Sequence, residues 1–354
     1  MSYVVEPIIE PDLPIVDPHH HLWDFRDRIA GAVPPVTHGF DNLLHLAPLY
    51  VAEDFQRDIE TGHNVVATVF IECDAMYRPD GPPEWRSLGE TEFVAAVAAS
   101  VPDTASTRMC AGIVGNVDLR LGDGAAPILE AHIEAGSGRF RGIRNGAAWD
   151  ADPDVLKHYA GAPAHLLTDP AFQSGFRHLS AYDLSFEAWV FEPQLPDVVA
   201  LAAAFPDTTI ILDHVGAPLG IASYAGRREE RFANWHANIR ALADHPNIVV
   251  KLGGLGMPFG GFDEFMAIPA ARSEQLAQSW KPYVESCIEA FGVHRCMFES
   301  NYPVDKTTAP YDLLWNAFKR LAAGYSDDEK AALFCDVAAR TYRLDMSRGT
   351  APLP

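Results

Sequence analysis

The segment Val65–Glu72 reads Val-Val-Ala-Thr-Val-Phe-Ile-Glu, a largely apolar run that ends in a carboxylate. Its apolar residues are continuous rather than alternating, which is typical of a parallel strand buried on both faces. A segment of helical length and periodicity, Glu90–Ser100, follows it. A strand followed by a helix is the repeating unit of α/β proteins with a parallel sheet, so this stretch predicts the fold class.

Seven further runs resemble this one, and most are followed by a helical segment. Eight strands alternating with helices favour a closed (β/α)8 TIM barrel over an open doubly wound sheet. An open sheet stays possible, but neither G-x-G-x-x-G after the first strand nor G-x-x-x-x-G-K-[ST] occurs, so its nucleotide-binding versions have no support. The other expected strands are Ile15–Asp17, Met109–Val114, Phe140–Arg144, Leu184–Val190, Thr209–Asp213, Ile248–Leu252 and Cys296–Ser300.

The length of 354 residues is compatible with two domains or with one barrel. The chain contains no low-complexity linker and no convincing internal repeat. We therefore expect a single barrel domain over residues 1–354, with long loops at the C-terminal ends of the strands. Segments rich in Pro and Gly, such as 26–48 and 77–86, are interpreted as loops at the barrel mouth.

The charge balance restricts the partners. The chain carries 27 Lys and Arg against 48 Asp and Glu, a net charge of −21, which argues against nucleic acid and anionic membranes. A small-molecule substrate is expected, and an acidic one is allowed because one or two cations in a cleft outweigh the global charge locally. The absence of a secretory signal and five scattered cysteines predict a cytoplasmic protein, and a homodimer is a fair prior.

Polar residues gather just past the expected strands, where barrel enzymes carry their chemistry. In an extended segment His19 and His21 point to one side and His20 points away, so the pair can bind one metal ion. The alternative is a solvated histidine loop. His214 follows a strand and faces the same mouth, as a ligand or as a hydrogen-bonded histidine. The other positions of this kind are Asp17, Glu72, Arg144-Asn145, Glu192, Gln194, Asp213, Lys251 and Glu299–Asn301.

Glu72 and Arg144 each allow two interpretations. A carboxylate at the end of an apolar run is costly unless it is paired. Glu72 could be paired with Arg144 or with a histidine, or it could act as a metal ligand or a general base. Arg144 either neutralises Glu72 or binds a substrate carboxylate or carbonyl oxygen. Lys251 has the same two interpretations, and the structural one is favoured.

Taken together, several motifs resemble the amidohydrolase superfamily, and more narrowly the amidohydrolase-2 branch of metal-dependent TIM-barrel hydrolases. The resemblance runs from about residue 15 to about residue 343. It implies hydrolysis of a lactone of a small, acidic metabolite from sugar-acid or aromatic catabolism, with non-oxidative decarboxylation of an aromatic or unsaturated carboxylic acid as the alternative and a non-catalytic ligand-binding barrel as the third. The motifs are Ile-Val-Asp17-Pro-His19-His-His21-Leu-Trp23-Asp24, Phe-Ile-Glu72, Arg141-Gly-Ile-Arg144-Asn145, Ile-Leu-Asp213-His214-Val-Gly-Ala-Pro218 and Met-Phe-Glu299-Ser-Asn301-Tyr-Pro303-Val.

One position departs from the family pattern. Many members carry Asp in the eighth-strand Gly-Ser-Asp-x-Pro motif, whereas the matching residue here is Asn301. An amide neither accepts a proton usefully nor carries charge to hold a cation. Glu299, Asp305 or Glu72 could replace the missing carboxylate. His214 or His20 could instead act as base without a metal, or a metal could persist and supply hydroxide.

We therefore predict three groups of site residues. The predicted cofactor is a divalent metal, zinc or manganese, with a metal-free mechanism as the alternative. The predicted catalytic residues are His19, His21, Glu72, Arg144, His214, Asn301 and Asp305; the predicted substrate-binding residues are Trp23, His20, Gln194, Lys251 and Tyr302; the predicted metal ligands are His19, His21 and His214.

Overall fold

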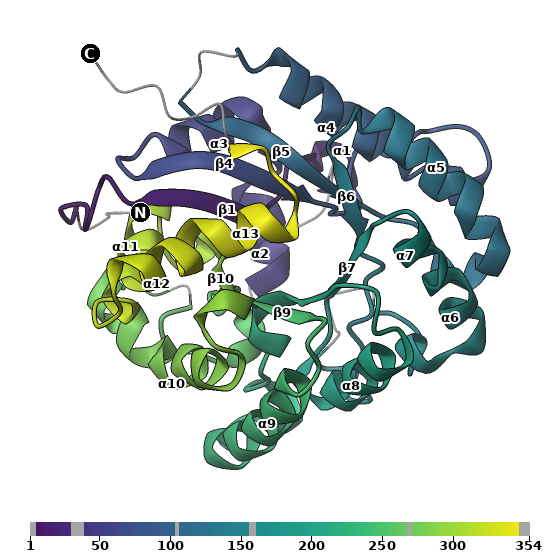
Figure 1. Cartoon of the computed structure of the whole chain (residues 1–354). Helices are drawn as coiled ribbons and strands as arrows, with labels where there is room; N and C mark the ends of the chain where they lie inside the picture. The colour runs from purple at the N-terminus through teal and green to yellow at the C-terminus, as the bar shows by residue number, and fades with distance from the viewer. Residues whose placement is uncertain are drawn as a thin grey trace.

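The computed structural model describes residues 5–29, 39–102, 106–155, 161–265, 267 and 271–346. Eight parallel strands form one sheet whose order follows the chain (Figure 1). The first and last strands meet through a parallel bridge between His20 and Tyr302, and the His21 amide donates to the Tyr302 carbonyl at 2.7 Å. This contact closes the sheet, so the prediction of a (β/α)8 TIM barrel is confirmed. The strands are β1 (Pro14–His20), β4 (Asn64–Ile71), β5 (Arg108–Gly115), β6 (Phe140–Ile143), β7 (Ser185–Ala188), β8 (Ile210–Leu212), β9 (Ile248–Leu252) and β10 (Cys296–Phe298).

Helices connect the strands and form the outer layer of the barrel (Figure 1). They pack through apolar faces, as where Phe318 of α11 stacks on Phe298 of β10 with ring centroids 4.9 Å apart. The helices are α1 (Arg26–Ile29), α2 (Gly39–Leu46), α3 (Ala52–Ile59), α4 (Leu88–Ser100), α5 (Ala125–Ala135), α6 (Pro170–Phe176), α7 (His178–Ala181), α8 (Leu195–Ala204), α9 (Arg228–Ala243), α10 (Ser273–Phe291), α11 (Tyr311–Leu321), α12 (Asp327–Ala331) and α13 (Val337–Thr341). In the described part of the chain, no helix is long and apolar enough to cross a membrane.

The lower half of the barrel interior is apolar. The last helical segment, from α12 to α13, is yellow in Figure 1. It packs against β1 and β10 and contributes to the apolar cluster inside the barrel. We call the inward strand residues of the cluster the lower layer. They are Val16, Ala67, Val69, Ile71, Val114, Ile211 and Met297.

The strands were predicted within three residues at either end, because long apolar runs bounded by polar residues mark parallel strands. The mouth is more structured than expected. Within the predicted loop 26–48, α1 and α2 are helical, while residues 30–38 lie outside the described residues. Two short antiparallel strands, β2 (Trp23–Asp24) and β3 (Leu49–Tyr50), flank this loop and anchor its two ends.

Candidate active site

The end of β1 brings two imidazoles into the barrel and turns a third away. His19 and His21 have ring centroids 4.9 Å apart, and both are buried. The Nδ1–H of His21 donates to the carbonyl of Ile71 at 2.8 Å, which leaves its Nε2 as an acceptor. Burial and nearby cations, chiefly Lys251 for His19 and Arg144 for His21, lower the pKa of both histidines well below the usual value. Both rings are therefore neutral.

His214 lies beside His19 because the chain turns sharply after β8. Its φ of 56° is left-handed, and the ring centroids of His214 and His19 are 4.6 Å apart. Gly254 makes room for the ring: a Cβ at this glycine would lie 2.3 Å from His214 Nδ1. Trp189 packs edge-on against the other side at 4.9 Å. The imidazole is thus held between a glycine and an indole.

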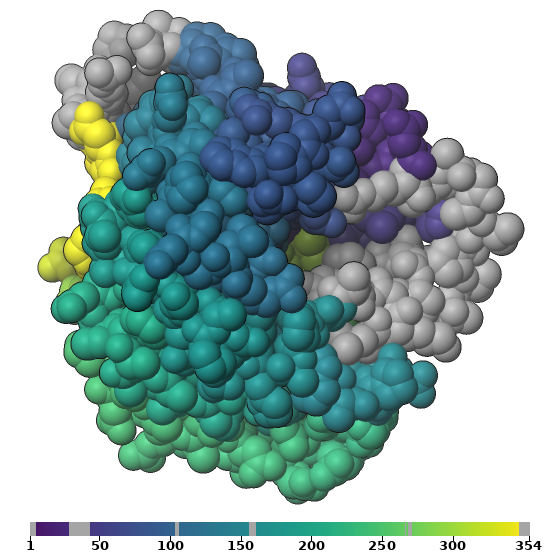
Figure 2. All heavy atoms as spheres, turned by 90° about the vertical axis from the view of Figure 1, so that its right-hand side faces the viewer, coloured from purple at the N-terminus to yellow at the C-terminus, as the bar shows by residue number. Residues whose placement is uncertain are grey.

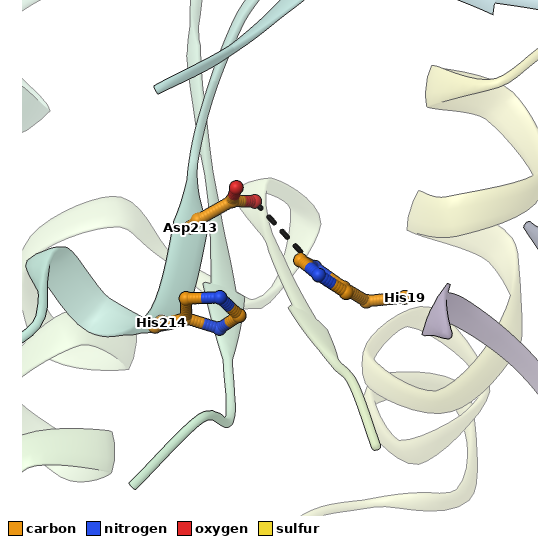
Figure 3. Close-up of side chains that lie close together, drawn as sticks. All are labelled: His19, Asp213 and His214. Atoms are coloured by element: carbon orange, nitrogen blue, oxygen red, sulfur yellow. Dashed lines mark ion pairs between the residues drawn. The ribbon is translucent and has the colours of Figure 1, made fainter. Parts of the chain in front are cut away.

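Asp213 joins these histidines in one group of potential ligands. Its Oδ1 lies 3.7 Å from His19 Nδ1, and ligand atoms of Asp213, His19 and His214 all lie within 4.8 Å of one another (Figure 3). Its Oδ1 is also 3.2 Å from Lys251 Nζ, and its Oδ2 is 3.6 Å from Arg144 Nη1. Burial alone raises the pKa of Asp213, but Lys251 and the other cationic groups outweigh it and the pKa is lowered. The carboxylate stays ionised.

Lys251 projects inward from β9 and is fully buried below these groups. Its Nζ lies 2.8 Å from Glu187 Oε2 and 3.1 Å from His19 Nδ1. The hydroxyl of Tyr342, from the C-terminal segment, donates to Glu187 at 2.5 Å. Burial would lower the pKa of Lys251, but the carboxylates of Asp213 and Glu187 outweigh it and raise that pKa. The lysine is therefore a fixed internal cation.

Glu299, the first residue after β10, lies between two of the imidazoles. Its Oε2 is 2.7 Å from His19 Nδ1 and its Oε1 is 2.7 Å from His214 Nδ1. The side chain is fully buried. One carboxylate therefore contacts the rings of two strands.

Arg144, after β6, is held by Glu72, after β4. Its Nε donates to Glu72 Oε1 at 2.7 Å, and its Nη2 donates to the Glu72 main-chain carbonyl. Its Nη1 is 3.4 Å from His19 Nε2. Burial raises the pKa of Glu72, and the Arg144 guanidinium opposes that rise. The paired interpretation of Glu72 thus matches the geometry.

A cavity of about 490 Å³ lies above these groups, at the C-terminal ends of the strands. His21, Glu72, Arg144, His214 and Asn301 reach its wall, while His19 and Asp213 lie beneath it. In Figure 2 the surface is hollowed between the purple N-terminal part and the blue and teal segments. Further residues of the wall are Trp23, Phe25, Leu43, Leu44, Cys73, Asp74, Asn116, Arg120, Asn145, Gly146, Gly161, Ala162, Pro163, Leu166, Trp189, Met257 and Val304.

The comparisons with known proteins agree with this architecture. The model of the amidohydrolase family (Amidohydro_2) matches residues 16–344. The chain belongs to the amidohydrolase family. The predictions of this family and of an amidohydrolase-like enzyme are therefore confirmed. As expected for a member, its polar groups converge at the C-terminal ends of the barrel strands.

Three similar proteins each cover nearly the whole of this chain. An uncharacterised protein of Sinorhizobium fredii, y4mH, is 34% identical and covers 94% of this chain and 99% of its own length. The L-fucono-1,5-lactonase of Burkholderia multivorans is 32% identical over 93% of this chain and 96% of its own. A crystal structure of a Burkholderia multivorans amidohydrolase with bound zinc is 28% identical, with a TM-score of 0.69, covering 94% and 99%.

The group of potential metal ligands differs from the predicted set. The structure groups His19 and His214 with Asp213 rather than with His21. Two imidazoles and a carboxylate are a common donor set for a divalent transition metal. Within the described residues, both carboxylate oxygens of Asp213 are buried without a hydrogen-bond partner. A divalent cation would pair with this carboxylate and with the neutral imidazoles, so the residues fit such an ion.

Four of the five predicted substrate-binding residues do not line the cavity. His20 points out of the barrel, where Thr68 lies 2.9 Å from its Nε2 and Phe55 stacks on its ring. The Gln194 amide bonds instead to the main chain at Ala147, Trp149 and Phe191. Tyr302 donates its hydroxyl to the carbonyl of Ala309. Lys251 lies below the cavity, within the charged network.

Asp305 is also separated from the cavity, by Asn301. Its Oδ1 accepts from Asn301 Nδ2 at 2.8 Å and its Oδ2 accepts from the Gly256 amide at 3.1 Å. Burial raises the pKa of Asp305 to about 7, against these hydrogen bonds. The carboxyl therefore orients the Asn301 amide and does not line the cavity, and its role as the base stays a prediction.

Trp23, a predicted substrate-binding residue, reaches the cavity. Other residues around the site were not predicted from the sequence. Asp213 and Glu187 were not among the predicted site residues, and Trp189 was not predicted at all. The signal that could have found the two acids is the period of two along a strand, since Asp213 follows the inward Ile211 by two positions. Trp189 lies just after β7, and the sequence around it carries no comparable signal.

Proposed function

We propose that this enzyme hydrolyses the ring ester of a sugar-acid lactone. Support comes from the family, from the relative at 32% identity named L-fucono-1,5-lactonase, and from the cavity over the imidazole cluster. The observation that carries the proposal is the pairing of Arg144 with Glu72 at the cavity wall. This pair keeps a guanidinium beside the histidines without giving the site a surplus positive charge.

The charges of the cavity wall favour an uncharged ligand. Its charged residues are two carboxylates, Glu72 and Asp74, and two guanidinium groups, Arg120 and Arg144. Arg120 also forms an ion pair with Asp118. An acidic substrate, as the sequence suggested, would find no unbalanced cation among these groups. A neutral lactone with several hydroxyl groups matches the mixture of polar and aromatic side chains better.

The residues of the site would divide the reaction as follows. Arg144 Nη1 would donate to the carbonyl oxygen of the lactone and stabilise the charge that develops there. The Nε2 of His21, kept as an acceptor by the hydrogen bond of its Nδ1–H, would take a proton from the water that attacks the carbonyl carbon. It would return this proton to the ring oxygen as the C–O bond of the ester breaks. Trp23 and Trp189 would exclude bulk water and align the ring.

A divalent metal would be held by His19, Asp213 and His214. When bound, such an ion polarises a carbonyl oxygen or lowers the pKa of a water molecule to about 7. The zinc seen in the similar amidohydrolase of Burkholderia multivorans supports zinc as the first ion to test. Manganese stays the second prediction. The cytoplasmic location, the single domain and the homodimer also stay predictions.

The test is a panel assay on the purified enzyme, with its metal content measured in the same samples. L-Fucono-1,5-lactone, other neutral sugar lactones and a lactone with a free carboxylate would be followed by proton release above the spontaneous rate. We expect turnover of the neutral lactones and little of the acidic one. Absence of turnover across all neutral lactones would contradict the proposal.

Decarboxylation is the second candidate and is tested in the same panel. It would need a cation free to hold the substrate carboxylate, and Arg144 is already paired with Glu72. Aromatic carboxylic acids in the panel should therefore release no carbon dioxide. Release of carbon dioxide with consumption of a proton would favour this candidate over hydrolysis.

A further inference from the structure

Glu299 is placed where the barrel interior changes from apolar to charged. It follows β10 directly, two positions beyond the inward Met297, so the alternation of the strand turns its side chain inward. The side chain is fully buried, and a carboxylate in such a place needs partners. Its partners are the two imidazoles of the candidate metal site.

The contacts of Glu299 bear on which ring nitrogens carry hydrogen. Its Oε1 lies 2.7 Å from His214 Nδ1 and also accepts from the His214 main-chain amide at 3.2 Å. Its Oε2 lies 2.7 Å from His19 Nδ1. A carboxylate can only accept, so His214 Nδ1 carries the hydrogen and His214 Nε2 keeps its lone pair. The contact of Oε2 with His19 is not a hydrogen bond, since this oxygen has no hydrogen-bond partner among the described residues. That is the arrangement needed for Nε2 to bind a metal or accept a proton.

Lys251 contacts the same nitrogen of His19, at 3.1 Å from its Nζ. An ammonium group can only donate, so Lys251 would favour the opposite tautomer of this ring. Among the described residues, the hydrogen bond of Lys251 thus bears on His19, whereas the hydrogen bond of Glu299 bears on His214.

The end of β9 has the space that this carboxylate requires. A Cβ at Gly253 would lie 2.4 Å from Glu299 Cγ, and one at Gly254 would meet the ring of His214 at 2.3 Å. Any larger residue at either position would displace the pair. Two adjacent glycines therefore accommodate the carboxylate and the ring it contacts.

We infer that Glu299 is the positioning carboxylate of the site and fixes His214 with hydrogen on Nδ1. It takes this part instead of position 301, where Asn301 donates its amide to Asp305 and supplies no charge. Its effect on turnover rests on the proposed lactone hydrolysis, whereas its effect on the His214 ring does not.

The experiment compares the whole protein with Glu299→Gln, using histidine labelled with ¹⁵N in the imidazole. His19→Asn and His214→Asn assign the two signals, and the metal content of every sample is recorded. We expect Nδ1–H at His214 in the wild type and a change to Nε2–H at this ring in Glu299→Gln. Turnover of the neutral lactone should fall by about 10- to 100-fold.

Glu192→Gln is the matched control. Glu192 is equally buried and accepts from Arg231 Nε at 3.1 Å, but it lies outside the cavity wall. This variant should leave both ring tautomers unchanged. If Glu299→Gln does not fold, Glu299→Asp takes its place, because a side chain one methylene shorter moves the carboxylate away from His214 Nδ1 and the tautomer of this ring should still change.

The outcomes separate the inference from the proposed function. An unchanged tautomer of His214 in a folded Glu299 variant would overturn the positioning role, whatever happens to turnover. A changed tautomer of His214 in a protein whose wild type opens no lactone would support the positioning role and contradict the proposed function.

Discussion

The upper and lower halves of the barrel interior are built from the same strands and differ in chemistry. In the lower layer, Ile211 of β8 and Met297 of β10 pack in an apolar cluster. Two positions beyond these residues stand Asp213 and Glu299, which belong to a network of ions. We call this network of charged side chains and histidines, with Arg144 and Lys251, the upper layer. Two residues along the strand thus separate apolar side chains that pack from charged side chains at the site. Burial of apolar surface stabilises the lower layer, whereas the charged groups of the upper layer are stabilised by their ion pairs and hydrogen bonds.

The comparison is sharpest at Lys251, whose replacement should have the largest effect on stability. Lys251→Met leaves the buried carboxylates of Glu187 and Asp213 without their shared cation. We expect the free energy of unfolding to fall by about 3–5 kcal/mol, measured by urea denaturation. Lys281→Met removes an exposed lysine paired with Glu285 and should change it by less than about 0.5 kcal/mol. Equal effects of the two variants would refute the view that the upper layer depends on its ion pairs.

In the lower layer, Met297→Ala should cost stability without altering the chemistry. The side chain is fully buried, so its truncation leaves a cavity and should lower the free energy of unfolding by about 2–4 kcal/mol. Turnover per folded molecule should stay near the wild-type rate, as judged by lactone hydrolysis at matched folded fraction. Met297→Leu preserves the volume and should cost less than about 1.5 kcal/mol. A specific loss of turnover in Met297→Ala would mean that the layers are not separable.

The smallest expected effect concerns Glu90 of α4, which borders the mouth rather than either layer. Its Oε1 accepts from the amides of Cys73 and Ala75, which hold the segment after β4. Burial, with a contribution from Glu72, raises the pKa of Glu90 from 4.5 to about 8. Between these values the folded protein binds a proton that the unfolded chain has lost, so stability falls as the pH rises through this window.

Glu90→Gln should therefore weaken this fall in stability. Urea midpoints at pH of about 5 and about 8 would measure it. Glu92→Gln, an exposed change on the same helix, serves as control and should leave the fall in place. If Glu90→Gln shows the same pH dependence as the wild type, the carboxyl of Glu90 does not titrate in this window.

Much of the fold could be predicted, because eight apolar runs separated by helical segments allow few other arrangements. The candidate site was predicted in part, since His19, His21 and His214 follow from their places at strand ends. What was missed depends on contacts between distant segments. Lys251 was expected at the cavity and lies beneath it, because Tyr342 and Glu187 hold the network below. His20 was expected near the substrate, although the alternation of β1 already directed it outward.

We propose that the upper layer, and Arg144 in particular, catalyses lactone hydrolysis. The most direct measurement compares proton release from a neutral sugar 1,5-lactone by Arg144→Met and Arg231→Met. Both variants break an ion pair of Arg with a buried Glu, but the pair of Arg231 and Glu192 lies outside the cavity wall. We predict that Arg144→Met lowers kcat by about 100-fold or more while Arg231→Met, per folded molecule, keeps the wild-type value. Equal rates in the two variants would contradict the account.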